Sequence, residues 1–384
     1  MSLRARPSYR EGVNTSSITL HDHRVVALRE TVADLAARPP AAREFLDEVE
    51  HRLRRVIPFD GGDWWTSDPE TLLPMELRPF EYPALQYEVA ANDVNRLDDL
   101  DRQSRTVSTL GLTMPGERAR SARFDDHYRL PGAGDQMRVL ARNGGWTWGA
   151  ACLYRGADLP DFTRDEVAVI SAVSRDVGLA LRTDLLRTVR RDGTGWTHQA
   201  PGAHAGTVVV DRDDRVLGYT PEGGRWLERL GVALSTDRLP ASLRWITLQA
   251  RTHERLSDGG MGIGMRPLRQ ASSRLRTTTG ELVTVRADVL RGAVDQAVVL
   301  ALEPASGPTM WPLLVALHGL TRRETELAAL LVAGRSIKDI ATDLHLSVHT
   351  VRDHVKAVYT KVGISSRPEL TAQLGRGPGV GPGA

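Results

Sequence analysis

Residues 320–374 read LTRRETELAALLVAGRSIKDIATDLHLSVHTVRDHVKAVYTKVGISSRPELTAQL, and the spacing of this stretch predicts four short helices. Thr321 followed by Glu324 is typical of a capping box, in which a hydroxyl and a carboxylate each satisfy a backbone N–H at the start of a helix. Gly334 stands where a left-handed C-terminal cap is expected. Ser347 is expected to be the N-cap of the third helix.

The second and third predicted helices are separated by only a few residues. Ser336 opens the second helix, and a tight turn through His345 and Leu346 leads to the third. Two short helices joined by such a turn, the second carrying cations, are typical of a helix-turn-helix whose second helix enters the major groove. We expect the third helix to bury Val348, Val351, Val355 and Val358 and to point Arg352, Lys356 and Lys361 outward.

A set of signature residues runs through all four predicted helices. Its members are Leu320, Thr321, Glu324, Gly334, Ser336, Ile340, Ala341, Leu344, Leu346, Ser347, Thr350, Val351, His354, Val355, Lys361, Val362, Gly363, Ser366, Arg367, Glu369 and Leu370. With these residues the region resembles the LuxR-type C-terminal helix-turn-helix of bacterial transcription regulators. The resemblance implies that the partner is double-stranded DNA.

The resemblance also implies that Arg352, Asp353 and Lys356 face the groove and contact bases. An arginine can bind O6 and N7 of guanine with two hydrogen bonds, which discriminates against a wrong base. The alternative for Arg352 and Lys356 is a solvated helix face without a DNA contact. Asp353 would repel phosphate, so it either accepts a hydrogen bond from a cytosine amino group or lies clear of the DNA.

Four further residues are expected to contact phosphate, which positions the helix without reading sequence. They are Ser347, His349, Thr350 and Lys361. His354 is expected to be packed or bonded within the fold.

Composition and charge place the chain among ordinary water-soluble proteins. It has 384 residues, 41% of them hydrophobic and 26% charged, so two or three domains are expected. The net charge is only +2, and the basic bias is local to the predicted third helix. The single cysteine excludes an internal disulfide framework, and no apolar run is long enough to cross a membrane. We expect a cytoplasmic protein without a membrane partner.

The predicted fold class is multidomain α+β, with two antiparallel-sheet sensory domains followed by an all-α four-helix domain. Changes in composition and pattern divide the chain into segments. We expect a flexible N-terminus at 1–22, a first sensory domain at 23–191, a linker at 192–205, a second sensory domain at 206–304, a linker at 305–315, the helix-turn-helix domain at 316–376 and a disordered tail at 377–384.

The first sensory domain is predicted from two amphipathic helices, a strand, a second strand and a long helix. The helices are expected at 23–37 and 41–57, the strands at 59–65 and 146–155, and the long helix at 163–190, opened by a capping box at Thr163 and Glu166. With Phe59-Asp60, Asp68-Pro69-Glu70, Gly149-Ala150, Leu153-Tyr154-Arg155 and Asp161-Phe162-Thr163, this region resembles a GAF-type sensory domain. The Asn-Lys and Phe-Asp-Glu pattern of cyclic-nucleotide-binding members is missing from the sequence, which disfavours that ligand.

The second sensory domain is predicted from short strands. Strands are expected at 207–211, 215–219, 274–278, 282–290 and 297–303, with a helix beginning at Pro221. Val283, Val285, Ala287 and Val289 share one face, which is the period-two signature of a strand. Through the stretch VVVDRDDRVLGYTPEGGRWLERLG this region resembles a PAS-type domain. Tyr219-Thr220-Pro221 replaces the asparagine that is common after the second strand, which puts a shared ligand contact in doubt.

Other candidate chemistry is weaker. His21 and His23 lack a third ligand at metal-site spacing, so no metal is expected, and Cys152 is expected to be a buried apolar residue rather than a redox sensor. The pairs Trp64-Trp65 and Trp146-Trp148 could line an aromatic pocket, but alternation should turn only one of each pair inward. The glycines of 259–264 lack the context of a phosphate loop, so we expect a flexible loop and no cofactor.

These patterns favour a transcription regulator whose sensory domains respond to a small-molecule or protein effector and control operator binding. A homodimer on a palindromic site is expected, with the long helix at 163–190 and the last helix at 368–374 as contact surfaces. The alternative for the long helix is an ordinary cover over its own sheet. The alternative function is a sensory adaptor that acts through proteins without sequence-specific DNA binding. No catalytic motif follows the sensory domains, so the chain is not expected to be an enzyme.

Overall fold

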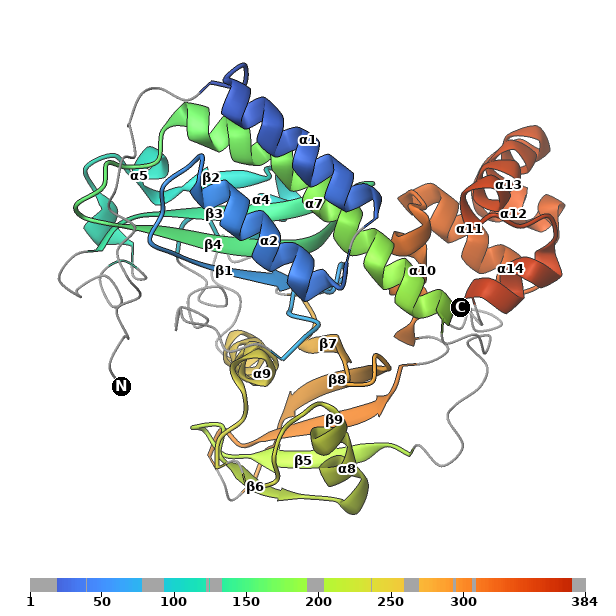
Figure 1. Ribbon diagram of the computed structural model, residues 1–384. Coiled ribbons are helices and arrows are strands. Elements are labelled where there is room, and N and C mark those ends of the chain that lie inside the picture. The colour runs from blue at the N-terminus through green and yellow to red at the C-terminus, as the bar shows by residue number, and fades with distance from the viewer. Residues whose placement is uncertain are drawn as a thin grey trace.

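The computed structural model describes residues 19–38, 40–77, 93–121, 124, 133–191, 204–235, 237–258, 269–292, 295–305 and 309–374. Figure 1 shows three groups of elements, two of them built on a sheet and one built only of helices. We call them the first sheet unit, the second sheet unit and the helical unit. Most of the predicted segments 1–22, 192–205 and 377–384, and the glycines of 259–264, lie outside the described residues.

The first sheet unit is an antiparallel sheet with helices on one face (Figure 1). Its strands are β1 (Gly61–Thr66), β2 (Val107–Thr109), β3 (Ala133–Asn143) and β4 (Trp146–Gly156), in the order β1-β4-β3-β2. The covering helices are α1 (His23–Ala37), α2 (Ala42–Arg54) and α7 (Arg164–Arg191). Between β1 and β3 lie α4 (Leu97–Arg102), α5 (Leu110–Thr113) and the short 3-10 turn η1 (Arg118–Arg120).

The predictions for the start and the end of this unit are confirmed to within a few residues. The helix predicted at 23–37 has those bounds, and the strand predicted at 146–155 is β4. The predicted capping box opens α7, where the Thr163 amide donates to Glu166 Oε2 at 2.8 Å and the Glu166 amide donates to Thr163 Oγ1 at 3.2 Å. These elements depend on local signals, which the sequence carries in full.

Strand β3 was not predicted from the sequence. Gln136 and Arg138 are buried on the sheet face that also carries Trp65, and such polar residues hide the period-two pattern that identifies a strand. The pairing of Gln136 with Tyr154 and of Arg138 with Cys152 fixes its register.

The prediction that only one tryptophan of each pair faces inward is wrong. Trp146 and Trp148 are two positions apart on β4, so they share a face, and both pack in the same cluster. The pair at 64–65 differs. Both side chains are buried, and they lie on opposite faces of the sheet because they are adjacent on β1. Trp64 packs with the helices that cover the sheet, whereas Trp65 packs toward the second sheet unit. Both faces of this sheet are therefore covered.

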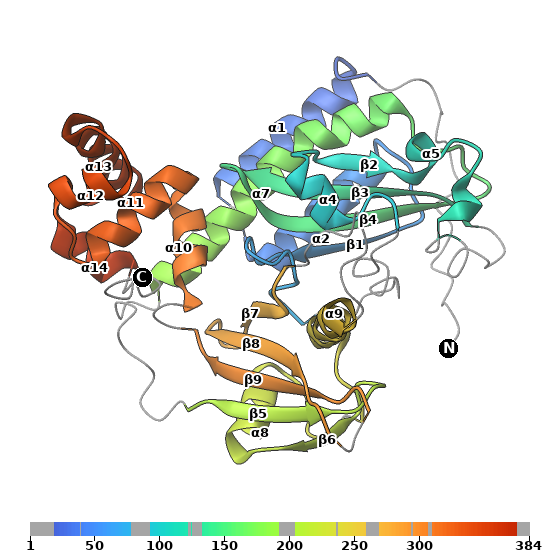
Figure 2. The same ribbon diagram turned by 180° about the vertical axis from the view of Figure 1, so that it is seen from behind.

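The second sheet unit has five antiparallel strands in the order β6-β5-β9-β8-β7. They are β5 (Gly206–Val210), β6 (Val216–Tyr219), β7 (Ser272–Arg276), β8 (Leu282–Val289) and β9 (Val298–Pro304). The predicted strands and the helix α8 (Pro221–Arg229) are confirmed. Helix α9 (Ala241–Asp258) was not predicted, and Figures 1 and 2 place it between the two sheets.

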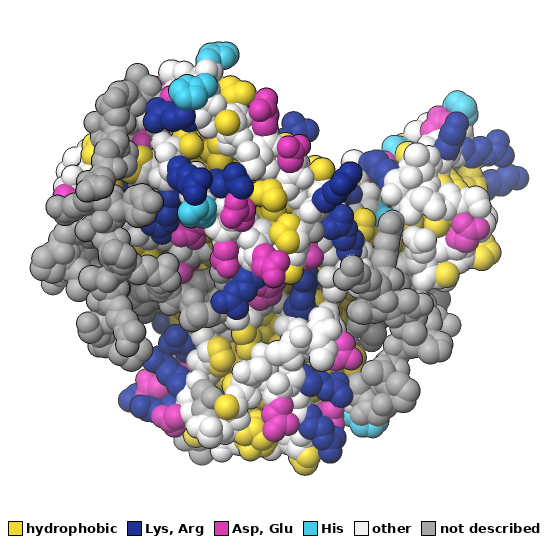
Figure 3. Space-filling view, in the orientation of Figure 1, with side chains coloured by type: hydrophobic (Ala, Val, Ile, Leu, Met, Phe, Trp, Pro, Cys, Tyr) yellow, Lys and Arg dark blue, Asp and Glu magenta, His cyan; other side chains and the backbone are white. Residues whose placement is uncertain are grey.

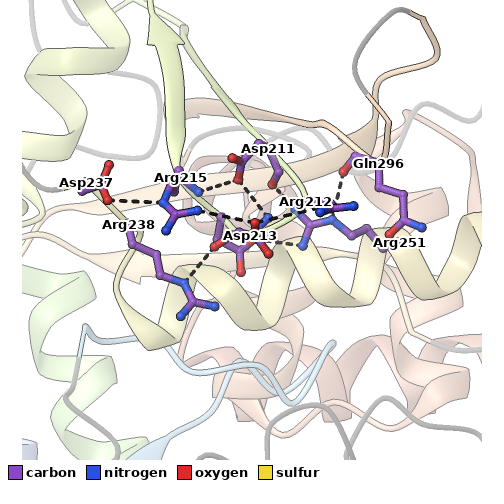
Figure 4. Close-up of polar contacts among 9 residues, drawn as sticks. Asp211, Arg212, Asp213, Arg215, Asp237, Arg238, Arg251 and Gln296 are labelled. Atoms are coloured by element: carbon purple, nitrogen blue, oxygen red, sulfur yellow. Dashed lines mark hydrogen bonds and ion pairs between the residues drawn. The ribbon is translucent and has the colours of Figure 1, made fainter. Parts of the chain in front are cut away.

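A buried arginine of α9 fixes the turn between β5 and β6 (Figure 4). Arg251 donates to the Asp211 carbonyl at 2.7 Å, to Asp214 Oδ1 at 2.9 Å and to the Gln296 carbonyl at 3.0 Å. Asp214 has a left-handed backbone (φ 62°), which aspartate tolerates better than most residues. Arg251 thus ties the turn to α9.

The two sheet units meet through arginines of the second unit and carboxylates of the first. Arg274 donates to Asp68 Oδ2 at 2.7 Å and to Glu70 Oε2 at 2.6 Å. Arg269 forms ion pairs with Asp98 and Asp101. We call this contact region the sheet junction.

The helical unit contains one helix more than the sequence predicted within the described residues. It consists of α10 (Trp311–His318), α11 (Arg322–Val332), α12 (Ile337–Asp343), α13 (Val348–Val362) and α14 (Arg367–Leu374). Helix α10 begins inside the segment 305–315 that was expected to be a linker. Its residues 311 and 313–317 are all buried, so it has no amphipathic stripe to reveal it in the sequence.

Among the described residues, no helix combines the length and the apolar character that a membrane crossing requires.

Candidate nucleic-acid interface

Helix α13 begins at the N-cap that the sequence predicted and ends at a glycine that was not predicted to cap it. The Ser347 hydroxyl accepts a hydrogen bond from the Thr350 amide at 3.0 Å, which makes it the N-cap. Gly363 adopts the left-handed conformation (φ 78°) that ends the helix. Because both ends are fixed by local contacts, the orientation of the side chains along α13 is well defined.

One face of α13 packs into the helical unit against α11 and α12. Val351, Val358 and Val362 are buried, and Val355 is partly buried. The prediction that Val348 is buried is wrong, because its side chain is 37% exposed. It occupies the first turn of the helix, which extends past the apolar cover.

The opposite face carries the three residues predicted to contact bases, and Arg352, Asp353 and Lys356 are all exposed. Within the described part of the chain, the side chains of Arg352 and Lys356 have no hydrogen-bond or ion-pair partner. Asp353 Oδ2 lies 3.7 Å from His349 Nε2, one helical turn away, and both side chains are exposed. The structure thus brings the three residues together on one accessible face.

The residues predicted to contact phosphate fall into two groups. Ser347 and His349 are exposed at the start of α13, and the partly buried Thr350 shares a hydroxyl–hydroxyl hydrogen bond of 2.8 Å with Ser347. Lys361 lies at the other end, where its Nζ donates to Glu324 Oε2 at 2.6 Å and to the Gly319 carbonyl at 3.3 Å. In this structure the Lys361 ammonium therefore joins α13 to the start of α11.

Glu324 combines two functions in the scaffold. It completes the predicted capping box, accepting from the Thr321 amide at 2.7 Å, and it also receives the bond from Lys361. Burial pushes the pKa of Glu324 upward, but the hydrogen bonds from Lys361 and Thr321 outweigh it, so the pKa lies below its ordinary value. The carboxylate is therefore charged at neutral pH and holds α13 in place.

Two arginines to which the sequence assigned no contact, Arg323 and the signature residue Arg367, also fix the scaffold. Arg323 donates to the carbonyl of Leu344 at the end of α12, and Arg367 donates to the carbonyl of Leu331 near the end of α11 at 2.7 Å. Cations near a helix C-terminus satisfy its free carbonyls. Their sequence positions alone could not reveal these contacts, because each partner belongs to another helix.

Positive charge is concentrated in the part of the helical unit that runs from α13 to the start of α14. Between residues 347 and 367 there are four cations, Arg352, Lys356, Lys361 and Arg367, against the single carboxylate Asp353. Figure 3 shows lysine and arginine side chains gathered on the outer end of this lobe, with the surface hollowed between the lobe and the first sheet unit. Such a local basic surface is suited to the phosphate backbone of nucleic acid.

Other candidate chemistry does not converge on a site. Among the described residues, no group of three or more His, Cys, Asp or Glu side chains is placed to hold a metal ion. Cys152 is buried on β4, in agreement with the prediction that it packs as an apolar residue.

The comparisons with known proteins concern this same end of the chain. Residues 318–373 match the family model of bacterial regulatory proteins, luxR family. The spore germination protein GerE of Bacillus subtilis (strain 168) is 39% identical over 55 residues, which are 14% of this chain and 74% of GerE. The oxygen regulatory protein NreC of Staphylococcus aureus (strain JH9) is 43% identical over 51 residues, which are 13% of this chain and 24% of NreC.

Among solved structures, a Vibrio cholera VqmA–ligand–DNA complex covers 49% of this chain and 89% of the VqmA chain, at 15% identity and a TM-score of 0.22. A TM-score this low carries no argument about the arrangement of the whole chain. The relationship to known proteins rests on the helices that follow residue 317.

Proposed function

Because the chain belongs to the LuxR family of bacterial regulatory proteins and is a DNA-binding transcription regulator, we propose that α13 is its recognition helix. Arg352 and Lys356 contact base edges in the major groove, and Asp353 accepts from a cytosine amino group or lies beside the DNA. The observation that carries this proposal is the exposed cationic face of α13, whose opposite face is anchored in the helical unit.

We propose phosphate contacts for Ser347, His349, Thr350 and Lys361. The first three lie at the N-terminus of α13, where the helix dipole favours an anion. Lys361 differs from them, because a phosphate would compete with Glu324 for its ammonium. Its contribution to DNA affinity is therefore expected to be smaller than that of Arg352 or Lys356.

Binding as a homodimer to a palindromic site is part of the proposal. A single recognition helix reads few base pairs, and a two-fold dimer places two such helices in successive major grooves. The candidate contact surfaces are α7 and α14. The exposed side of α14, which includes Pro368, Ala372 and Gln373, supports its assignment.

We propose that the first and second sheet units are GAF-like and PAS-like sensory domains that respond to a small-molecule or protein effector, with domain boundaries as given by the sequence. The polar residues on the face of the first sheet that carries Trp65 support a small polar effector. Gln136 is only 2% exposed, and within the described residues neither atom of its side-chain amide has a hydrogen-bond partner. A buried amide of this kind normally has partners, which a bound molecule can supply.

Selection of genomic fragments bound by the full chain tests the DNA-binding proposal. A recurring palindrome is expected, and the double variant Arg352→Ala/Lys356→Ala should weaken binding to it by at least about tenfold while relaxing base preference. Arg212→Ala, an exposed arginine of the second sheet unit, is the matched control and should leave affinity unchanged. Unchanged affinity and selectivity in the double variant would exclude α13 as the recognition helix.

The second candidate is a sensory adaptor that acts by binding proteins. Asp353 favours it, because a carboxylate within the groove-facing row opposes phosphate and here lies beside His349. The same selection separates the two functions. An adaptor would recover unrelated fragments, with binding that is lost steeply as salt is raised.

A further inference from the structure

Helix α10 connects the helical unit to the first sheet unit. Its buried residues Leu313, Leu314 and Leu317 leave no polar face, and the helix contacts both α7 and α14. Figures 1 and 2 both show α10 beside the C-terminal half of α7, with α13 at the far end of the helical unit. An apolar helix of this kind is stable only between partners.

A single arginine of α7 holds the C-terminal end of α10. Arg182 Nε and Nη2 both donate to the Leu317 carbonyl, at 2.9 and 2.6 Å, and Nη1 donates to Asn143 Oδ1 at 3.2 Å. Asn143 is the last residue of β3, at the turn to β4. The guanidinium therefore joins the sheet, the long helix and α10 at one point.

The same short junction is held from the other side by α13. Gly319, two residues after Leu317, has a left-handed backbone (φ 66°), and its carbonyl accepts from Lys361 Nζ at 3.3 Å. A Cβ at Gly319 would lie 3.3 Å from Arg182 Nη2, so the guanidinium packs directly against this turn. Contacts thus run without a gap from Asn143 through Arg182 and the turn to the recognition helix.

Two residues after Arg182, α7 is also tied to the second sheet unit. Asp184 Oδ2 lies 3.0 Å from Arg276 Nη1 of β7. One short part of α7 therefore contacts both the helical unit, through Arg182, and the second sheet unit, through Asp184. A shift or rotation of α7 at this level must displace both contacts.

The bonds of Arg182 differ in strength from an ion pair. Its three hydrogen bonds end on two uncharged oxygens, and the two bonds to the Leu317 carbonyl benefit from the negative end of the α10 dipole. Burial lowers the pKa of Arg182 from its ordinary value, although arginine stays charged at neutral pH. Such a contact can be exchanged for water more readily than a buried pair of opposite charges.

We propose that Arg182 is a positioning residue for operator binding, which fixes the orientation of the helical unit on the first sheet unit by holding the end of α10. This inference rests on the proposed function, because its consequence concerns a dimer on two half-sites. With the contact intact, the two recognition helices of a dimer keep one separation. With the contact released, each helical unit reorients and two-site binding loses its geometric advantage.

The test compares the full chain with Arg182→Ala and Arg182→Lys, and uses Arg175→Ala, an exposed arginine on the same helix, as the matched control. The first measurement is amide hydrogen exchange of residues 311–320. Exchange there should rise at least about tenfold in Arg182→Ala and less in Arg182→Lys, which keeps one charged donor nitrogen. The control should match the unmodified chain. Equal exchange in all four proteins overturns the inference.

The second measurement uses DNA duplexes that carry one or two copies of the half-site found by fragment selection. Arg182→Ala should weaken two-site binding about five- to tenfold, leave single-site binding within about twofold, and tolerate inserted base pairs between the half-sites. An equal loss on both duplexes, or no loss on either, overturns the inference. If the unmodified chain selects a recurring palindrome, the proposed function holds whatever the Arg182 variants do. If it selects none, the proposed function is contradicted. The exchange measurement needs no operator, so it still tests the contact of Arg182 with α10.

Discussion

The sheet junction and the contact between α7 and α10 are both held by arginine, but the arginines have different partners. In the sheet junction, Arg274 binds two carboxylates, one of them the completely buried Asp68. At α10, Arg182 binds uncharged oxygens. Removing one member of a buried ion pair leaves an uncompensated charge, whereas carbonyl acceptors lose only hydrogen bonds.

This difference indicates which units of the molecule move together and which unit can move separately. The two sheet units are joined by the buried ion pairs of the sheet junction and by the contact of Trp65 with Trp245, so we expect them to move as one platform. The helical unit is attached by an apolar helix and by hydrogen bonds that water can replace. A change sensed anywhere in the platform is therefore expected to appear as motion at α10.

The largest effect is expected from Arg274→Ala. It leaves Asp68 buried and unpaired, so the free energy of unfolding should fall by about 3–5 kcal/mol in chemical denaturation. Arg286→Ala on the neighbouring strand is the control, because its pair with Glu303 involves an arginine side chain that is 53% exposed and should contribute less than about 1 kcal/mol. Similar losses of unfolding free energy in the two variants would contradict the expectation that the buried pair stabilises the protein more than the exposed pair.

Leu314→Ala tests the apolar side of the comparison. The side chain is buried in α10, and its truncation should lower the free energy of unfolding by about 3 kcal/mol. Leu217→Ala on β6, where the side chain is 52% exposed, should change it by less than about 0.5 kcal/mol. If Leu314→Ala is equally mild, α10 does not hold the helical unit through burial.

Thr321→Ala examines the turn beside α10 with a smaller change. It removes the hydroxyl that caps α11, so the helical unit should lose about 1 kcal/mol of stability in thermal unfolding. The partly buried Thr325 donates its hydroxyl to the Thr321 carbonyl at 2.9 Å but caps no backbone N–H, and it provides the control Thr325→Ala. A control variant that loses as much as Thr321→Ala would show that the cap is not responsible.

The smallest expected effect is a dependence on pH. The pKa of Glu324 is lower in the folded protein than its ordinary value of 4.5, with burial opposing and the bonds from Lys361 and Thr321 producing the shift. The stability from this carboxylate is therefore complete above about pH 4.5 and is lost as the pH falls through the depressed pKa. Unfolding followed between about pH 3 and 6 should show a shallower acid loss in Glu324→Gln. An unchanged slope would mean that other groups dominate.

The features that were predicted from the sequence depend on neighbouring residues. The capping box of Thr321 and Glu324, the N-cap Ser347 and the left-handed Gly334 after α11 each need only a few consecutive positions, and all are present. The exposed face of α13 followed from the same periodicity. Which of its residues contact DNA stays a prediction.

The features that were missed depend on what lies across space. Helix α10 has no stripe because it is covered on all sides, and β3 carries Gln136 and Arg138 on a face that other segments bury. Trp64 and Trp65 are both buried because helices cover one face of their sheet and the second sheet unit approaches the other. Arg182 showed no signal in the sequence, since its partner Leu317 is a backbone carbonyl more than a hundred positions away.

The indole rings of Trp65 and Trp245 meet edge to face across the two sheet units, with centroids 5.4 Å apart. Electronic transitions of aromatic rings at this distance couple, so the pair should contribute a distinct near-ultraviolet circular dichroism signal. That signal would vanish when the platform comes apart and persist when only the helical unit swings. The circular dichroism of this tryptophan pair can therefore distinguish separation of the two sheet units from reorientation of the helical unit, without an added label.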